Sequence, residues 1–333
     1  MIRLVKIAIA AGLLWSGYWY AAGYGLRSGI AGWFSAREAR GWQADYADLS
    51  TSGYPLRHIN TLTSPALADP ATGAAWQADW LGLESPAIWP GRQTVRFAPT
   101  PQRLSYFDQT VEVLAQDMVA ELFLHPGLAL ELQRMALTAG PWQVADDHGL
   151  VIGGHTLTLA MDQSDADAAY RLDFRAENFT PGAALRRLAR ATDTLPAGFE
   201  TLALTMTVTF DRPWDRRALE ERRPQPVAID LDLAAAQWGS MRIEAAGKVV
   251  VDAQGRPEGA IELRAENWRE MFEMARASGN LPQSAVNAAE KALGLLAGLG
   301  RNPDALDVQL NLRDGQVALG PFPLGPAPRL ILR

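Results

Sequence analysis

The histidines are the residues of this sequence whose type and spacing could do chemistry. His148 and His155 lie seven residues apart, across an expected turn that begins at Asp146-Asp147. Two imidazoles near a turn could supply part of a metal site, although no standard ligand spacing such as H-x-x-x-H is present. His58 and His125 lie far from this pair in the sequence. We interpret all four as hydrogen-bonded residues of turns and strands, and we predict no metal site.

The carboxylates and the missing motifs lead to the same conclusion. Asp162, Asp165 and Asp167 form a polar cluster, but it lacks the glycine and the closing glutamate of an EF-hand loop, so we predict a solvated hairpin tip. The sequence has no G-x-S-x-G, Walker A or G-x-G-x-x-G motif. It also has no cysteine, which excludes disulfides, thiolate metal sites and cysteine nucleophiles. We therefore predict that the protein is not an enzyme and has no catalytic, cofactor-binding or metal-binding residues and no cofactor.

One mixed-charge segment could contact an anionic group. Trp214 and Arg216-Arg217 are followed by Glu220-Glu221-Arg222-Arg223. Arginine pairs well with phosphate, so contact with a phosphate or a lipid headgroup is one interpretation. A solvated loop is the other interpretation, and it is the default for a segment of mixed charge.

Composition and charge describe a folded protein with two unlike parts. The chain has 333 residues, of which 48% are hydrophobic, and its net charge of −6 argues against a nucleic-acid partner. Residues 1–40 carry five basic residues and one acidic residue, so the remainder has 26 basic and 36 acidic residues. A basic N-terminal segment on an acidic body suggests that this segment meets a membrane.

The first secondary-structure element that we expect is a segment long enough to cross a bilayer. Ile7–Leu26 is 20 residues long without a charge, and it follows Arg3 and Lys6. Twenty helical residues span roughly the 30 Å of a hydrocarbon core. The positive-inside rule leaves Arg3 and Lys6 in the cytoplasm and exports the rest. We therefore predict a single-pass protein of a bacterial inner membrane, with its N-terminus cytoplasmic and its body periplasmic.

Two other interpretations of this segment stay open. A cleavable signal peptide would have a shorter apolar region and an A-x-A-type site, of which Tyr20–Gly23 is a poor version. A buried core helix is the third interpretation. We favour an uncleaved anchor over residues 1–35, followed by an exported β-rich body over residues 36–333.

The periodicity of the body is mostly that of strands. Apolar and polar residues alternate in the segments 202–210, 227–233 and 241–245, as in strands with one buried face. Hairpins are predicted for 118–124 with 128–137 around His125-Pro126-Gly127, and for 306–312 with 316–319 around Asp314-Gly315. Helical spacing is found at 185–192, 268–275 and 284–299.

An internal repeat is the most informative pattern in the body. Residues 172–179 match residues 261–268, including an identical Arg-Ala-Glu-Asn tetrapeptide at an offset of 89. A strand and turn precede each copy and helical spacing follows it, which predicts repeated strand-strand-helix units near 154–192 and 247–278. The asparagines of the two copies, Asn178 and Asn267, are predicted to cap the helices that follow.

The ordered set of these features resembles the DUF2125 family of bacterial envelope proteins over essentially the whole chain. The resemblance rests on the N-terminal anchor, Gly53-Tyr54-Pro55-Leu56-Arg57-His58, the Arg-Ala-Glu-Asn units and the ending Gly320–Pro328. That family looks similar in turn to AsmA-like envelope proteins, whose long curved sheet is thought to guide lipids. The resemblance implies a lipid-facing role by analogy only.

These observations predict a β-rich α+β fold: an N-terminal transmembrane helix, then an elongated, curved, mainly antiparallel sheet with short helices on one face. The function we expect is that of an inner-membrane-anchored periplasmic protein that binds or shields lipid-like apolar ligands, in envelope lipid traffic. The alternative is a structural or assembly factor that contacts other envelope proteins through sheet edges. An apolar concavity along strands such as 202–210 and 227–233 would favour lipid binding, and a polar face would favour the scaffold.

Overall fold

A computed structural model describes residues 1–166, 168–183, 198–270, 304–319 and 322–332, together with a few isolated residues between these ranges. One long helix, α1 (Ile2–Glu38), precedes two antiparallel sheets. The smaller sheet has the order β1 (Gln43–Asp45), β4 (Ala66–Asp69), β5 (Ala74–Gln77), β8 (Gln102–Tyr106), β9 (Gln109–Ala115), β12 (Trp142–Asp146), β13 (Gly149–Gly154). The larger sheet has the order β2 (Asp48–Ser52), β3 (Arg57–Thr63), β6 (Trp80–Pro86), β7 (Arg92–Phe97), β10 (Val119–Leu124), β11 (Leu132–Ala139), β14 (Thr156–Gln163), β15 (Ala169–Phe179), β16 (Phe199–Phe210), β17 (Pro226–Trp238), β18 (Met241–Val251), β19 (Pro257–Glu266), β20 (Ala305–Arg313), β21 (Gln316–Leu319), β22 (Phe322–Pro326).

The chain passes repeatedly from the larger sheet into the smaller one and back. Each hairpin of the smaller sheet continues two neighbouring strands of the larger sheet, and the chain bends where it passes between them. The chain leaves β3, bends at Ser64-Pro65, makes the β4–β5 hairpin in the smaller sheet, and returns as β6. Ser64 has a φ of 50°, and proline has no backbone N–H to donate to a ladder, so regular pairing stops there. The β8–β9 and β12–β13 hairpins leave and re-enter the larger sheet in the same way. Small buried residues such as Ala98 and Ala115 lie at these bends and let the two halves approach closely.

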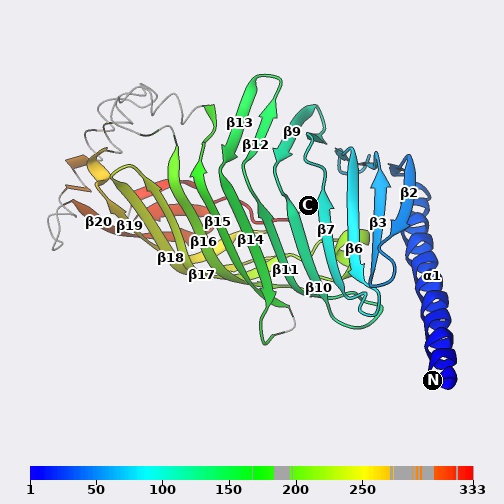
Figure 1. The fold of residues 1–333 in the computed structure, drawn as a ribbon. Coiled ribbons are helices and arrows are strands. Elements are labelled where there is room, and N and C mark those ends of the chain that lie inside the picture. The colour runs from blue at the N-terminus through cyan, green and yellow to red at the C-terminus, as the bar shows by residue number, and fades with distance from the viewer. Residues whose placement is uncertain are drawn as a thin grey trace.

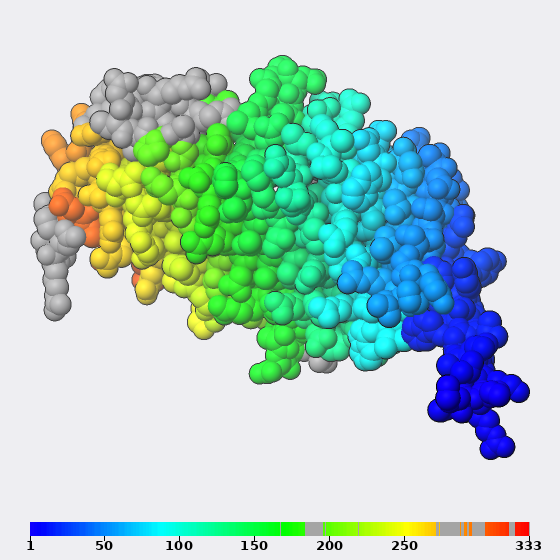
Figure 2. All heavy atoms as spheres, viewed as in Figure 1, coloured from blue at the N-terminus to red at the C-terminus, as the bar shows by residue number. Residues whose placement is uncertain are grey.

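The larger sheet is elongated and curved, and α1 lies at its N-terminal end beside β2 (Figure 1). The N-terminal part of α1 projects beyond the body (Figure 2). At the far end of the sheet the chain turns back: the backbone N–H of Leu330 donates to Gly255 O at 2.8 Å, and that of Leu332 donates to Gln225 Oε1 at 3.0 Å. This tail ties the β18–β19 turn to the segment between β16 and β17.

The fold class predicted from the sequence is confirmed, and so are the hairpins. The β10–β11 and β20–β21 pairs surround the two turns that the sequence indicated. One short helix, α3 (Arg216–Glu220), was not predicted: the mixed-charge segment was expected to be a loop. Asp215 caps α3, because its side chain accepts the backbone N–H of Arg217 at 2.8 Å.

Of the predicted helices, all of 185–192, most of 284–299 and half of 268–275 lie outside the described residues. Within these segments residues 268–270, 273, 287, 290, 291, 293 and 294 are described, and they are helical. The larger strand-strand-helix repeat therefore stays a prediction.

The two Arg-Ala-Glu-Asn tetrapeptides have the same local geometry. In each copy the alanine is buried, with Ala176 at 0% and Ala265 at 3% exposure, and the flanking Arg and Glu form an outward ion pair at 3.5 Å. In each copy the asparagine adopts a left-handed backbone, with a φ of 49° at Asn178 and 55° at Asn267. The prediction that Asn178 caps a helix is wrong, because Asn178 lies inside β15. Asn267 precedes helical residues, but its side-chain amide donates to Ser240 O at 2.6 Å.

Replacing Asn178 or Asn267 with alanine should lower the free energy of unfolding by about 1 kcal/mol, since a left-handed backbone costs alanine roughly 1–2 kcal/mol. Glycine adopts this conformation without a steric penalty, so Asn178→Gly is the matched control and should cost less than Asn178→Ala. Asn267→Gly still loses the bond to Ser240, so it should recover less. Urea unfolding followed by circular dichroism measures both pairs, and equal midpoints for the Ala and Gly variants would contradict the argument.

Candidate functional site

The face of α1 that meets the larger sheet combines bulky residues with very small ones. Residues on this face recur at the spacing of one helical stripe: Tyr18, Ala22, Gly25, Leu26, Gly29, Ile30 and Trp33. A Cβ built on Gly25 or on Gly29 would meet no atom within 4 Å. The small residues therefore leave an unfilled furrow between the aromatic residues at the two ends of the stripe.

Below this furrow lies an apolar cavity of about 1000 Å³. Its floor comes from the larger sheet through Leu62 of β3 and Leu81 and Leu83 of β6, and its far end from Leu67 and Trp76 of the smaller sheet. The volume is at the upper end of the 300–1,000 Å³ that ligand sites usually have. The alternation of β3 and β6 places these leucines on the face that α1 covers, so the sequence pattern of the strands positions the floor.

Helix α1 is held over the cavity at both ends by specific contacts. Trp19, which is 5% exposed, stacks on the ring of His58 at 4.7 Å between centroids and donates to Arg57 O at 2.9 Å. His58, which is 1% exposed, makes a 3.0 Å hydrogen bond from its Nε2 to the carbonyl oxygen of Trp19. At the other end Phe34 is buried in a cluster with Ala44, Leu49 and Leu62.

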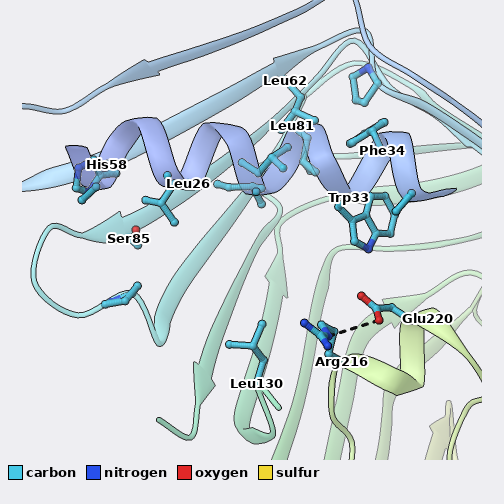
Figure 3. Close-up of a pocket in the computed structure, with 18 of the residues that line it drawn as sticks. Leu26, Trp33, Phe34, His58, Leu62, Leu81, Ser85, Leu130, Arg216 and Glu220 are labelled. Atoms are coloured by element: carbon cyan, nitrogen blue, oxygen red, sulfur yellow. Dashed lines mark ion pairs between the residues drawn. The ribbon is translucent and has the colours of Figure 1, made fainter. Parts of the chain in front are cut away.

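Few polar side chains face the cavity. Ser85 and His58 lie at one end, and Arg216 and Glu220 of α3 lie across the cavity from Trp33 (Figure 3). Arg216 Nε is 3.4 Å from Glu220 Oε2, and the side chain of Arg216 is 54% exposed. An exposed guanidinium beside an apolar cavity can pair with a carboxylate or phosphate group of an amphipathic ligand. The mixed-charge segment singled out in the sequence is thus brought to this apolar cavity.

Contacts from two directions bring α3 to this position. Arg37 of α1 and Arg40, which follows the helix, each donate to the carbonyl oxygen of Glu220, at 3.3 and 3.0 Å. On the other side the backbone N–H of Arg216 donates to Ala129 O at 2.9 Å.

The segment that carries α3 begins at Asp211, whose pKa is lowered. Partial burial of this carboxyl raises its pKa, but hydrogen bonds from Gln225 and Arg222 outweigh that effect. Asp211 is therefore charged at neutral pH and fixes the segment that carries α3.

The remaining residues considered for chemistry do not converge. His125 Nε2 is hydrogen-bonded to Gln163 Oε1 at 2.7 Å, His148 lies in the β12–β13 turn, and the backbone N–H of His155 donates to Glu177 O. Within the described part of the chain, no three His, Asp or Glu side chains are close enough to hold a metal ion. Asp162 belongs to β14 and Asp165 to the turn after it, while Asp167 lies outside the described residues.

The cavity under α1 is not formed by the strands that the sequence pattern singled out for an apolar concavity. The apolar row of 202–210 does not line it: Val208 and Phe210 are buried in a cluster with Met161 and Tyr170, and Trp214 packs against them. The cavity lies instead at the N-terminal end of the sheet, under the helix for which the sequence favoured an uncleaved anchor. The spacing of Ala22, Gly25 and Gly29 is the signal that could have indicated it, because one helical face made of small residues leaves space beneath it.

The described architecture is that of a β-sheet protein with an N-terminal apolar helix and an apolar cavity between the helix and the sheet. The helix is long and apolar enough to cross a membrane, by length and composition. The chain belongs to the DUF2125 family, described as an uncharacterized protein conserved in bacteria, because the family model matches residues 19–328. No curated protein matches the sequence. The similarity to AsmA-like proteins stays a prediction.

Proposed function

We propose that this protein is anchored in the bacterial inner membrane by α1 and binds a lipid-like apolar ligand in the cavity beneath that helix, with its body in the periplasm. The observation that carries the proposal is the cavity itself. Its volume is about 1000 Å³, and leucine, isoleucine, tryptophan, phenylalanine and proline side chains dominate its lining. Apolar surface of this kind favours an apolar ligand by roughly 25 cal/mol for each Å² removed from water.

The charged groups at the cavity support an amphipathic ligand over a pure hydrocarbon. Arg216 is half exposed and pairs with Glu220, whose side chain is 18% exposed. An anionic headgroup would replace or share this partner, while its hydrocarbon chain lies along the stripe of Ala22, Gly25 and Gly29. Catalysis is not part of the proposal: Ser85 and His58 both line the cavity, but the Nε2 of His58 is hydrogen-bonded to Trp19 O at 3.0 Å.

Native mass spectrometry of the detergent-extracted protein tests this proposal. We expect the wild-type protein to carry a co-purifying lipid mass, and Gly29→Phe to lose most of it, because the added ring fills the furrow where a Cβ meets no atom. Replacing a helical glycine also favours the helix, so Gly29→Phe should fold. Gly12→Phe is the matched control: Gly12 is also free of neighbours within 4 Å, but it does not line the cavity, so lipid should be retained.

A second variant tests the polarity of the cavity lining, whereas Gly29→Phe tests the volume of the cavity. Leu26→Asp should also abolish the lipid mass, because it puts a carboxylate in the apolar lining. Wild-type protein that is free of lipid would contradict the proposal. That outcome would favour the other function predicted from the sequence, a scaffold that contacts envelope proteins through its sheet edges.

A further inference from the structure

We infer that three neighbouring loop tips beside α1 insert into the outer leaflet of the same membrane that α1 enters. The tips are residues 53–56 between β2 and β3, 87–91 between β6 and β7, and 125–130 between β10 and β11. This inference rests on the anchoring part of the proposed function and is independent of a ligand in the cavity.

The three tips form one apolar surface. Residues 53–56, 87–91 and 125–130 contain no Asp, Glu, Lys or Arg. Glu131, which completes the third loop, is partly buried and accepts from Gln163 Nε2 at 2.6 Å. Hydrogen bonds hold the tips side by side: Ala87 N–H donates to Leu56 O at 2.9 Å, and the N–H of Leu124, directly before the third tip, donates to Gly91 O at 2.8 Å. Large apolar side chains on the tips are exposed: Tyr54 51%, Leu56 71%, Ile88 68%, Trp89 59%, Leu128 90% and Leu130 44%. Contiguous exposed apolar groups of this size mark an interaction surface.

The place where this surface meets α1 identifies the membrane as its partner. Trp15 Nε1 donates to Pro55 O at 3.1 Å, and Tyr18 Oη donates to Ala87 O at 2.7 Å, so the tips meet the helix at residues 15–18. Arg3–Leu14 is the 12-residue part of α1 between the first charge and the body, and its internal charge, Lys6, lies about one turn from Arg3, where the long side chain can reach the headgroups. At about 1.5 Å per residue this part spans about 18 Å, which is roughly 12 Å less than a hydrocarbon core of about 30 Å.

This shortfall is removed if the body sinks into the membrane. The tips would then lie about 12 Å inside the hydrocarbon edge, close to the depth that interfacial apolar elements reach. The view of the whole surface agrees, since the blue end of α1 projects from the body on the side where these tips lie (Figure 2). Arg57 and Arg92 directly follow the first two tips and would lie nearer the headgroups, where a guanidinium can bind lipid phosphate.

The rest of the same sheet edge is different. The segment between β16 and β17 carries Arg212, Arg216 and Arg222, and the β18–β19 turn carries Asp252 and Arg256. The apolar surface is therefore confined to the end of the edge that lies beside α1, as a membrane contact requires. Ala87, Pro90 and Leu130 of the tips also line the cavity, so the cavity reaches the surface that would face lipid.

Depth-dependent fluorescence quenching tests the inference in the full-length protein, whose lack of cysteine allows single labels. The variants Leu56→Cys, Trp89→Cys and Leu128→Cys are labelled with a polarity-sensitive dye and reconstituted in phosphatidylethanolamine–phosphatidylglycerol vesicles with spin-labelled lipid. Phe107→Cys is the matched control, because Phe107 is 68% exposed in the β8–β9 turn away from these tips. Ile9→Cys reports on α1 itself.

We expect the three tip labels and Ile9→Cys to be quenched at least threefold more than Phe107→Cys. Quenching of Ile9→Cys alone would overturn the inference and leave the anchor in place. Quenching of none of the labels would overturn both the inference and the anchor, whereas equal quenching of Phe107→Cys and the tips would show that the tips have no special depth. None of these readouts depends on a ligand in the cavity.

Discussion

Replacing Trp19 with alanine should lower the free energy of unfolding by about 3–5 kcal/mol, the usual cost of removing a buried tryptophan. Trp19 is 5% exposed, stacks on His58, makes an edge contact with Tyr54 at 5.5 Å and donates to Arg57 O. The truncation removes all of these contacts and leaves a cavity between α1 and β3. It also leaves the imidazole of His58 without its stacking partner.

The variant Leu14→Ala is the matched control on the same helix. Leu14 is 76% exposed and lies just before the first contact of α1 with the body, so its truncation should change stability by less than about 0.5 kcal/mol. Urea unfolding in detergent micelles, followed by circular dichroism of the sheet, compares the two variants. Equal stability of Trp19→Ala and the wild type would show that α1 does not dock against the body as described. In that case α1 would serve as a membrane anchor only.

A phosphatase that is active only in the periplasm should be active when fused after residue 333, and a fluorescent protein that folds only in the cytosol should be dark at the same position. The physical reason is the pair Arg3 and Lys6, which precedes the uncharged segment Ile7–Leu26 and favours a cytoplasmic N-terminus. The expected difference is close to all-or-none, because each reporter works on one side of the membrane only.

A fusion that lacks residues 2–26 is the control for this experiment. Without the apolar segment the body has no route across the membrane, so the phosphatase should be inactive. A bright cytosolic reporter on the full-length chain, with an inactive phosphatase, would reverse the orientation we propose. Immunoblotting of the fusions also separates an uncleaved anchor from a cleaved signal peptide, because loss of residues 1–22 shortens the product.

Local patterns in the sequence determined much of the architecture. The alternation of 202–210 and 227–233 predicted long strands, and the turn residues at 125–127 and 314–315 predicted two hairpins that the structure contains. An uncharged run of 20 residues predicted the apolar helix. These features depend on residues that are close in sequence, so periodicity and turn chemistry are sufficient to identify them. The confirmed family membership agrees with the motifs that indicated it.

Only the tertiary structure decided where the apolar cavity lies and what surrounds it. Arg37 meets Glu220 across 183 residues of sequence, and Trp15 meets Pro55 across 40, and no local pattern encodes such pairs. The apolar face of a strand looks the same in the sequence whether its own chain covers it, as at Val208, or leaves a space beside it, as at Leu83. Which of these happens depends on the bends at positions such as Ser64-Pro65 and on the docking of α1, because burial is set by the packing of distant elements.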